Sequence, residues 1–474
     1  MEKTECNLLE NKFKNLNLRF FLAVCILVVL PLGWFVLGKL EGEDPSVEFD
    51  LPFPAIGATP NLPVTVSDNK SGLRHLWVGL IKNDKEFVFF EKNFPPAGMF
   101  GTGRISKESF NISANLKDKG INDGKAVLRI SARDYSWRRW WNGNRTLIEK
   151  EVTVDNRPPS VDVMSKIHNI IQGGAGFVIY RVSEPCAKSG VYVGENFFPG
   201  YSARNIITSK YNKEAEVFIA FIALDYRQGG ETDIFVQASD YAGNIRKEGF
   251  RYFIRKKTFK KDVLNLSDKF LDWELSEFNV NVPQDTSAPQ VEKFLAINRD
   301  LREANYRQLI GITKNTDQTL YWEGAFIRLP KSAGRAGFAD HREYRYEGRT
   351  IDHQVHLGVD LASLANSPVP AANRGRVAFV GDIGIYGHTI MIDHGFGLFS
   401  TYSHLSDSEV KDGQIVSKGD IIGHTGTTGL AVGDHLHFGI IVGGIFVNPI
   451  EWWDKAWIKN NISNKIKDAK AELN

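Results

Sequence analysis

Histidines are concentrated in one part of the chain, where their side chains could bind a metal or transfer protons. Eight of the eleven histidines lie between Ile351 and Pro449. They are His353, His356, His388, His394, His404, His424, His435 and His437. This stretch is therefore where we expect the chemistry of the protein.

Three of the polar side chains in this stretch have the spacing of a catalytic zinc site. In DHQVHLGVDLAS, His356 and Asp360 are four residues apart, and in DHLHFGI, His435 and His437 are two apart. If the second segment is a strand, alternation places both imidazoles on one face. A catalytic zinc takes about three nitrogen or oxygen ligands and keeps a position for water. His356, Asp360 and His437 supply that set.

A zinc site of this kind also needs a general acid or base. Zinc lowers the pKa of its water toward roughly 7 and polarises a carbonyl. His435, on the same predicted strand as His437, and His404, in FSTYSHLSD, are the candidates for transferring the proton.

Three motifs in this stretch resemble the lysostaphin/LytM family of zinc peptidoglycan endopeptidases. They are H-x-G-x-D at 356–360, Y-x-H-L at 402–405 and GTTGLAVGDHLHF at 426–438. The resemblance implies an antiparallel sheet with a groove across one face and one Zn²⁺ per catalytic domain. It implies that His356, Asp360 and His437 are metal ligands, and that His404 and His435 orient water and stabilise the oxyanion. Gly439 departs from the family, in which many members carry an acidic residue at that position.

The other four histidines of this stretch fall outside the motifs, and we expect structural or surface roles for them. They are His353, His388, His394 and His424.

The elements that position this site are expected to be mainly β. The predicted order is a cytoplasmic N-terminus (1–19), a transmembrane anchor (20–38), β-sandwich module 1 (45–156), β-sandwich module 2 (157–256), a helical linker (257–315), a zinc metallopeptidase domain (316–455) and a C-terminal helix or tail (456–474).

An uncharged run, FFLAVCILVVLPLGWFVL at 20–37, has about the length of a membrane-spanning helix. The basic residues Lys12, Lys14 and Arg19 precede it and acidic residues follow it, which places the N-terminus in the cytoplasm. No A-x-A cleavage site follows. We therefore expect an uncleaved single-pass anchor in the inner membrane, with the catalytic domain in the periplasm or extracytoplasmic space.

Residues 45 to about 255 contain short β-rich runs broken by Gly, Pro, Asn and Asp, which is typical of β-sandwich modules. The segments ISARDYSWRRWWNGN (130–144) and VQASDYAGN (236–244) indicate an internal duplication, and the Pro-Pro break in VTVDNRPPSVDV (152–163) indicates a boundary. The turns resemble bacterial immunoglobulin-like domains. The modules either bind glycan or a partner or act as a spacer. The cluster Trp137, Trp140 and Trp141 either stacks on sugars or packs in a core.

Between 260 and 310 the apolar spacing predicts two helical segments, one containing Val263, Leu266, Phe270 and Leu271 and the other Val291, Phe294, Leu295, Leu301 and Leu309. Pro283 and Pro289 separate them. We expect this linker to brace the catalytic domain, and hypothesise that it or the modules cover the groove. A final helix is expected from the spacing of Trp457, Ile458, Ile462 and Ile466.

Composition excludes some functions. A net charge of +2 carries no sign of nucleic acid as a partner. Cys6, Cys25 and Cys186 would lie in three compartments, so no disulfide is expected.

The expected function is zinc-dependent hydrolysis of peptide bonds in peptidoglycan cross-links or stem peptides. The alternative is a non-catalytic LytM-like regulator of a cell-wall amidase. The expected partners are the peptidoglycan peptide substrate and, through the anchor, the membrane. A protein regulator is left open and unidentified, and the sequence does not say which bond is cut.

Overall fold

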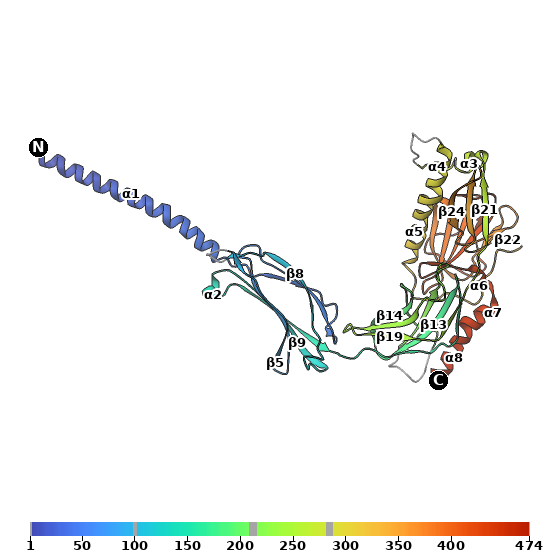
Figure 1. Ribbon diagram of the computed structural model, residues 1–474, viewed down its shortest axis with the longest axis horizontal. Helices are drawn as coiled ribbons and strands as arrows, with labels where there is room; N and C mark the ends of the chain where they lie inside the picture. Colours follow the sequence, from blue (N-terminus) through green and yellow to red (C-terminus); the bar gives the residue numbers. More distant parts are fainter. Residues whose placement is uncertain (1, 98–101, 208–215, 281–287, 474) are drawn as a thin grey trace. The chain divides into compact units, whose positions relative to one another are not determined.

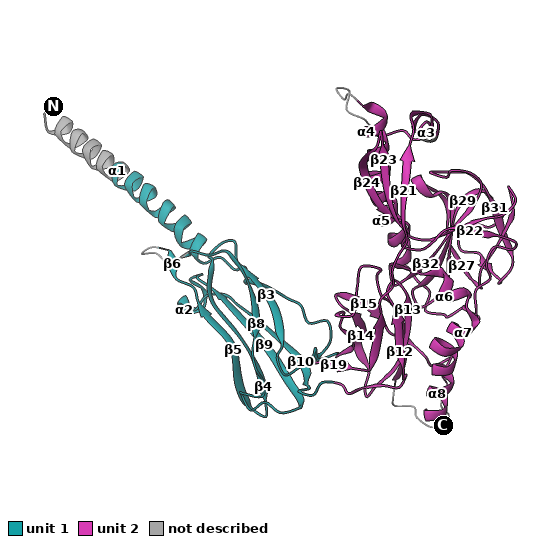
Figure 2. Cartoon of the chain, turned by 45° about the vertical axis from the view of Figure 1, so that its right-hand side comes forward, with its two compact units in different colours: residues 1–158, 241–244 teal, residues 159–240, 245–474 magenta. Residues whose placement is uncertain are grey.

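The computed structural model describes residues 2–97, 102–207, 216–280 and 288–473. Strands predominate over helices in these residues, so the prediction of a mainly β protein is confirmed. The chain divides into two compact units, residues 1–158 with 241–244 and residues 159–240 with 245–474 (Figure 2). The finer domain limits stay predictions.

Unit 1 begins with helix α1 (Glu2–Lys39). Its part Phe20–Lys39 is, in the described chain, the one helix long and apolar enough to cross a membrane. That statement rests on length and composition, and a signal sequence near the N-terminus would satisfy it equally.

The rest of unit 1 is a two-layer β structure. Its first sheet has the order β1 (Ser46–Phe49), β3 (Asn61–Ser67), β8 (Lys107–Ser113). Its second has the order β2 (Ala55–Ile56), β10 (Arg145–Val154), β9 (Gly124–Asp134), β4 (Leu73–Lys82), β5 (Lys85–Asn93), and β6 (Pro96–Ala97) pairs with β7 (Thr102–Gly103). Alternate residues of both sheets, such as Val64 and Ile130, lie in one core. An immunoglobulin-like topology stays a prediction.

Unit 2 opens with a second pair of sheets. One has the order β11 (Val161–Val163), β13 (Ala175–Val182), β17 (Glu216–Ala223), β16 (Tyr201–Ser202), and the other β15 (Asn196–Pro199), β14 (Cys186–Val193), β18 (Ile234–Asp240), β19 (Ile245–Gly249). Strand β12 (His168–Ile171) pairs in parallel with β20 (Tyr252–Arg255).

The histidine-rich region forms a large antiparallel sheet. Its order is β22 (Ala333–Ala336), β25 (Val359–Ala362), β32 (Leu436–Val442), β29 (Leu398–Ser408), β28 (Gly387–Asp393), β27 (Gly375–Ile383), β30 (Ile415–Val416). Off this path lie β26 (Pro368–Pro370), β31 (Ile421–Thr425) and β33 (Ile445–Val447), and the short turn η2 (Gly384–Tyr386) connects β27 to β28.

The linker prediction is partly wrong. Residues Lys261–Leu266, expected to be helical, form strand β21, which pairs in parallel with β23 (His341–Tyr346), itself paired with β24 (Arg349–Val355). The hydrogen-bonding partner of β21 is far away in sequence, so local spacing could not show it. Helix α3 (Asp268–Glu274) starts only after Ser267, whose hydroxyl accepts from the backbone N–H of Phe270.

The second helical segment is confirmed. It consists of α4 (Pro289–Leu295), η1 (Ala296–Leu301) and α5 (Arg302–Thr313), with Phe294, Ile297 and Leu309 buried. Pro289 occupies the first helical position, where its missing N–H costs nothing. Pro283 lies outside the described residues.

The C-terminal helices join the second pair of sheets to the large antiparallel sheet, which is called the catalytic sheet below because it carries the histidine-rich region. They are α6 (Pro449–Trp453), α7 (Lys455–Ile458), η3 (Lys459–Ser463) and α8 (Asn464–Leu473), and α8 lies beside β13 in Figure 1. Lys465 of α8 donates to the carbonyl of Phe177 at 2.9 Å, and Trp452 packs against Phe221 with ring centroids 5.8 Å apart. One continuous apolar core therefore runs through unit 2.

Glu451 is a buried carboxyl group at this junction, and it makes the stability of unit 2 depend on pH. One of its oxygens, Oε2, accepts from the backbone N–H of Ala175 at 2.8 Å, and the other, Oε1, is buried without a partner. Burial raises the pKa of Glu451 to about 7, although the bond to Ala175 N–H and the charges of Lys257 and Arg255 oppose the rise.

We predict that Glu451→Gln removes part of the pH dependence of unfolding. With a folded pKa of about 7 and an ordinary value of 4.5, the folded protein holds a proton that the unfolded chain has released. Stability therefore falls as pH rises from 4.5 to about 7, by roughly 3 kcal/mol if burial persists. Thermal unfolding of the variant and of the wild type, across this range, should converge at low pH and separate above pH 7. The exposed Glu472→Gln is the control, and a constant difference between variant and wild type would contradict the prediction.

Candidate functional site

Three adjacent strands of the catalytic sheet bring four of the five predicted site residues together. Asp360 of β25 lies directly opposite His437 of β32, and Ser403 of β29 lies opposite His437 on the other side. His435 precedes β32 and forms a bridge with Gly426. Directly opposed residues in an antiparallel pair project to the same face, so this register places the carboxylate against the imidazole.

His356 reaches the same point from the loop between β24 and β25. Its Nδ1 lies 2.9 Å from the carbonyl of Gly337, which can only accept, so Nδ1 carries the proton and Nε2 presents a lone pair in the neutral ring. Gly358 in this loop lies close to the ring of His437: a Cβ there would come within 2.5 Å of His437 Nε2. The absence of a side chain at 358 is therefore required for the approach.

Three donor atoms form a tight triangle at this point. His356 Nε2 lies 2.9 Å from Asp360 Oδ1 and 3.0 Å from His437 Nδ1, and His437 Nδ1 lies 2.9 Å from Asp360 Oδ1. All three residues are largely buried, with side-chain exposures of 6%, 13% and 6%. These atoms are close enough to one another to share one metal ion.

The protonation of the triangle fits a metal. When His437 carries its proton on Nε2, the three facing atoms hold lone pairs only, and these repel one another unless a cation lies among them. His437 Nε2 is itself buried without a hydrogen-bond partner. Two nitrogens and one carboxylate oxygen form a donor set that suits zinc.

Electrostatics keep these groups in metal-binding forms. Burial raises the pKa of Asp360, but the neighbouring His356 and His437 lower it more, so the net pKa lies well below its ordinary value. Burial lowers the pKa of His437 to about 4, against the opposing effect of its bond to Asp360. At neutral pH the carboxylate is charged and the His437 imidazole is neutral.

His404 is brought to the site by a β-bulge. On β28, His388 pairs with Leu405 and Ile390 pairs with Tyr402, so two residues of β29, Ser403 and His404, face one residue of β28. His404 has φ of +62°, a left-handed conformation that is rare for residues other than glycine. The bulge re-aims a side chain that regular alternation would send to the opposite face from Ser403.

His404 and His435 lie beside the triangle, and each ring is held through a hydrogen bond of its Nδ1 atom. The Nδ1 atom of His404 lies 2.8 Å from the carbonyl of Thr428, and that of His435 lies 2.8 Å from the carbonyl of Gly433. Both Nδ1 atoms therefore donate, which leaves Nε2 available to accept. The two ring centroids are 4.8 Å apart, and His435 Nε2 lies 3.6 Å from Asp360 Oδ1. Burial and the neighbouring His435 and His437 lower the pKa of His404 to about 3, so this ring is neutral.

A groove of about 920 Å³ opens over these histidines. Strand β21 and the residues Phe270 and Phe294 form one side of it, and the loop around Leu430 to His435 contributes to another. A second cavity of about 520 Å³ is lined by His356, His437 and Tyr386 as well, together with Arg227 and Tyr306. Residues of the linker therefore line the groove. That the linker braces the domain stays a prediction, and that it covers the groove stays a hypothesis.

Several supporting residues carry no signal in the sequence. The ring of Tyr386 lies 5.7 Å from that of His437, and Arg342 pairs with Asp360 Oδ2 at 3.2 Å. Asn305 of α5 accepts from the backbone N–H of Ile385 at 2.9 Å, which fixes the turn that carries Tyr386. These partners come from distant segments without a motif, so only the fold brings them together.

The remaining histidines of the stretch make other contacts. Both ring nitrogens of His394 are bonded, to the carbonyl of Arg374 and the hydroxyl of Ser400. His388 and His424 face aspartates, and His353 lines the second cavity.

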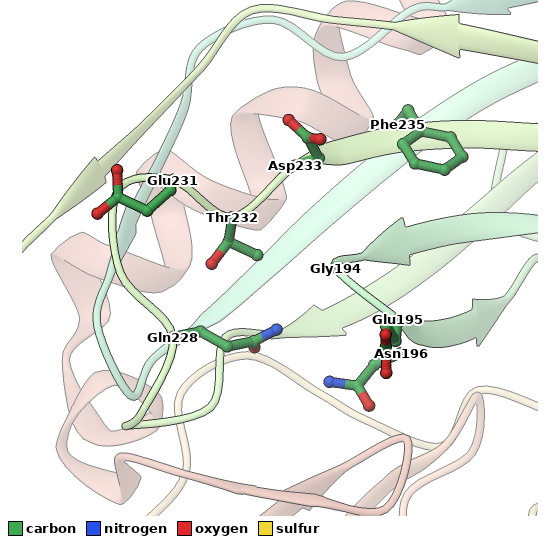
Figure 3. A pocket seen from close by; sticks show the side chains of 8 residues that line it. All are labelled: Gly194, Glu195, Asn196, Gln228, Glu231, Thr232, Asp233 and Phe235. Atoms are coloured by element: carbon green, nitrogen blue, oxygen red, sulfur yellow. The ribbon is translucent and has the colours of Figure 1, made fainter.

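A separate cavity of about 530 Å³ lies in the second pair of sheets. Its acidic side chains are Glu195, Glu231 and Asp233, and Figure 3 shows them spread around it rather than meeting at one point. This arrangement offers no shared ligand position.

The comparisons with known proteins place the histidine-rich region in a family. Residues 354–449 match the model of Peptidase family M23, which is a family of metallopeptidases. The chain is 38% identical over 97 residues to the DD-carboxypeptidase/endopeptidase Mpg of Neisseria meningitidis, a match covering 20% of this chain and 22% of that protein. It is 33% identical over 124 residues to the peptidoglycan DD-endopeptidase ShyB of Vibrio cholerae, covering 25% and 28%. The chain thus spans only about a quarter of the length of these relatives.

Solved structures of the same kind are also similar. The catalytic domain of lysostaphin from Staphylococcus simulans is 28% identical, with a TM-score of 0.23 over 26% of this chain and 94% of that one. A putative peptidase M23 from Pseudomonas aeruginosa is 19% identical, with a TM-score of 0.35 over 58% and 92%. The resemblance drawn from the three histidine motifs is confirmed by the sequence match. The C-terminal part of this chain, residues 354–449, is a Peptidase family M23 domain.

Proposed function

We propose that this protein is a zinc-dependent endopeptidase that hydrolyses peptide bonds in peptidoglycan cross-links or stem peptides. The observation that carries the proposal is the buried triangle of His356 Nε2, Asp360 Oδ1 and His437 Nδ1, with edges of 2.9 to 3.0 Å, inside an M23 domain. Relatives with the same domain are named as peptidoglycan DD-endopeptidases, which supports this substrate class.

His356, Asp360 and His437 would hold one Zn²⁺. Bound there, zinc would polarise the scissile carbonyl and lower the pKa of a water molecule. With three protein ligands, a zinc ion would keep a position for water, as a catalytic site requires. The groove, which the same three residues line, would give a substrate access to it.

His404 and His435 would move the proton and stabilise charge. A neutral imidazole whose Nδ1–H is bonded to a carbonyl presents Nε2 to accept a proton from water. The water oxygen then bonds to the carbonyl carbon, and the proton passes to the imidazole. When the C–N bond breaks, the leaving amine takes that proton. The second imidazole, which presents a lone pair at Nε2, would accept a hydrogen bond from the water and orient it. The imidazole that has taken the proton would donate Nε2–H to the oxyanion before it gives that proton to the amine.

The groove suits a peptide with free carboxylates. Arg335 lines it, and guanidinium groups bind carboxylates with two parallel hydrogen bonds. Arg302 and Arg342 also line the groove, but they bond to Asn298 and Asp360. Phe270 and Phe294 provide apolar contact on the same side.

The location that fits this substrate is outside the cytoplasm. The apolar part of α1, Phe20–Lys39, would anchor the protein in the inner membrane, with the basic Lys12, Lys14 and Arg19 on the cytoplasmic side. A regulatory role without catalysis is not favoured, because members that only regulate lack ligands, whereas this chain has the full set.

We predict that purified sacculi are digested by the full-length protein and that a chelator stops the digestion. His437→Ala should abolish both zinc binding and activity. His404→Ala and His435→Ala should keep zinc but lower kcat by roughly 10²- to 10⁴-fold, because each removes proton transfer or oxyanion stabilisation. Mass analysis of released muropeptides identifies the bond, and bound zinc is measured separately.

His424→Ala is the matched control, because His424 pairs with Asp407 outside the triangle. Full activity of His437→Ala would refute the metal assignment. Stimulation of an amidase by a zinc-free variant, with no digestion by the wild type, would support the regulatory alternative instead.

We also predict that Gly358→Ala weakens zinc binding at least tenfold. The added Cβ would lie 2.5 Å from His437 Cε1 and Nε2, so the ring must move by several tenths of an ångström and the triangle opens. Gly311→Ala, where a Cβ meets nothing within 4 Å, is the control. Competition with a chromogenic chelator measures the affinity, and equal affinities of both variants would contradict the role given to Gly358.

A further inference from the structure

Two large aromatic side chains are exposed on one turn of unit 1. Trp140 is 88% and Trp141 62% exposed, and they lie in the short turn α2 (Arg138–Trp141) between β9 and β10. Packing in a sandwich core, one of the two interpretations of these tryptophans, is therefore wrong for both. Arg138 and Arg139, beside them, are exposed as well.

The backbone of this turn is strained in a way that keeps the indoles outside. Arg139, Trp140 and Trp141 have φ of +48°, +57° and +63°. Three consecutive left-handed residues with side chains are unfavourable, because each Cβ crowds the following carbonyl. Strain of this kind is commonly found where a segment serves binding.

The turn is fixed to the end of the apolar helix. The ring of Trp137 meets that of Phe35 edge to face with centroids 5.7 Å apart, and the N–H of Trp137 donates to the carbonyl of Lys39 at 2.7 Å. Arg138 Nε donates to the carbonyl of Leu40 at 3.0 Å. Phe35 belongs to the last turns of the span Phe20–Lys39, so the tryptophan turn lies at the level where the span ends.

We propose that Trp140 and Trp141 insert into the headgroup boundary of the phospholipid bilayer that α1 spans, and so hold unit 1 against the membrane. The inference rests on the membrane anchor of the proposed function. Tryptophan favours this boundary because its ring is apolar and its N–H is polar. Arg138 and Arg139 supply positive charge for lipid phosphates.

The geometry favours a lipid surface over a glycan. The two indole planes are inclined at 55°, with centroids 6.5 Å apart, so their faces do not form one flat platform for successive sugar rings. A fluid interface accepts indoles at any mutual angle.

The test uses the full chain in nanodiscs containing phospholipids brominated near the headgroup, which quench nearby tryptophans. We expect the quenched tryptophan signal to fall by about half in W140A/W141A, because Trp34 and Trp137 remain near the bilayer. Each single variant, W140A or W141A, should show part of this loss. W273A, which removes an indole that is 71% exposed in unit 2, should leave the quenched signal unchanged.

Each other outcome decides against the proposal. Equal quenching in W140A/W141A and the wild type would overturn the insertion. Loss of binding to purified glycan strands, with unchanged lipid quenching, would assign the turn to glycan. A chain that does not enter nanodiscs would remove the anchor on which the inference rests, while sacculus digestion would still report separately on the peptidase.

Discussion

The geometry of the site depends on the close approach of three buried side-chain atoms that could share one metal ion. His356 Nε2, Asp360 Oδ1 and His437 Nδ1 are held within 3.0 Å of one another. Such an arrangement persists only where the surrounding fold enforces it. The register of β25 on β32 does so, because a slip by one residue would turn Asp360 to the other face.

Support for this triangle extends well beyond the matched family region. Asn305 of α5 holds the turn that presents Tyr386 to His437. Helix α5 in turn packs into a core that is continuous with the second pair of sheets. A perturbation near Glu451 or Lys465, far along the chain from His356, therefore acts on the same cooperative unit as the site.

Much of the site could be predicted from the sequence, because its chemistry is encoded in short motifs. His356, Asp360 and His437 converge as the motifs indicated. The spacing within each motif is local, whereas the pairing of β25 with β32 that joins the motifs is implied only by the family resemblance. The bulge that turns His404 toward the site could not be predicted. The bulge arises because two residues of β29 face one residue of β28. Alternation along one strand does not show how many residues the neighbouring strand places opposite it.

The fold likewise contains elements that the sequence predicts and elements that it does not. The apolar span and the helix starting at Pro289 follow from composition and periodicity over long windows. Strand β21 was mistaken for a helix because KDVLNL is short and its pairing partner, β23, begins at His341. The exposure of Trp140 does not follow from the sequence for a similar reason, since an aromatic residue in a β-rich segment usually belongs to a core.

Because β21 pairs in parallel with β23, the residues assigned to chemistry and part of the groove lining are encoded in different parts of the gene. The family region, residues 354–449, contains all five residues assigned to chemistry, but part of the groove lining is encoded before it, in residues 262–266, Phe270 and Phe294. Recombination or drift in that earlier stretch can change the groove lining while leaving these five residues unchanged. Transferring only residues 354–449 into another chain would carry the five residues without the wall of the groove, and also without Gly337 and Asn305, which help to position them. Proteins that share residues like 354–449 can therefore differ in the lining of the groove without a change in the five residues assigned to chemistry.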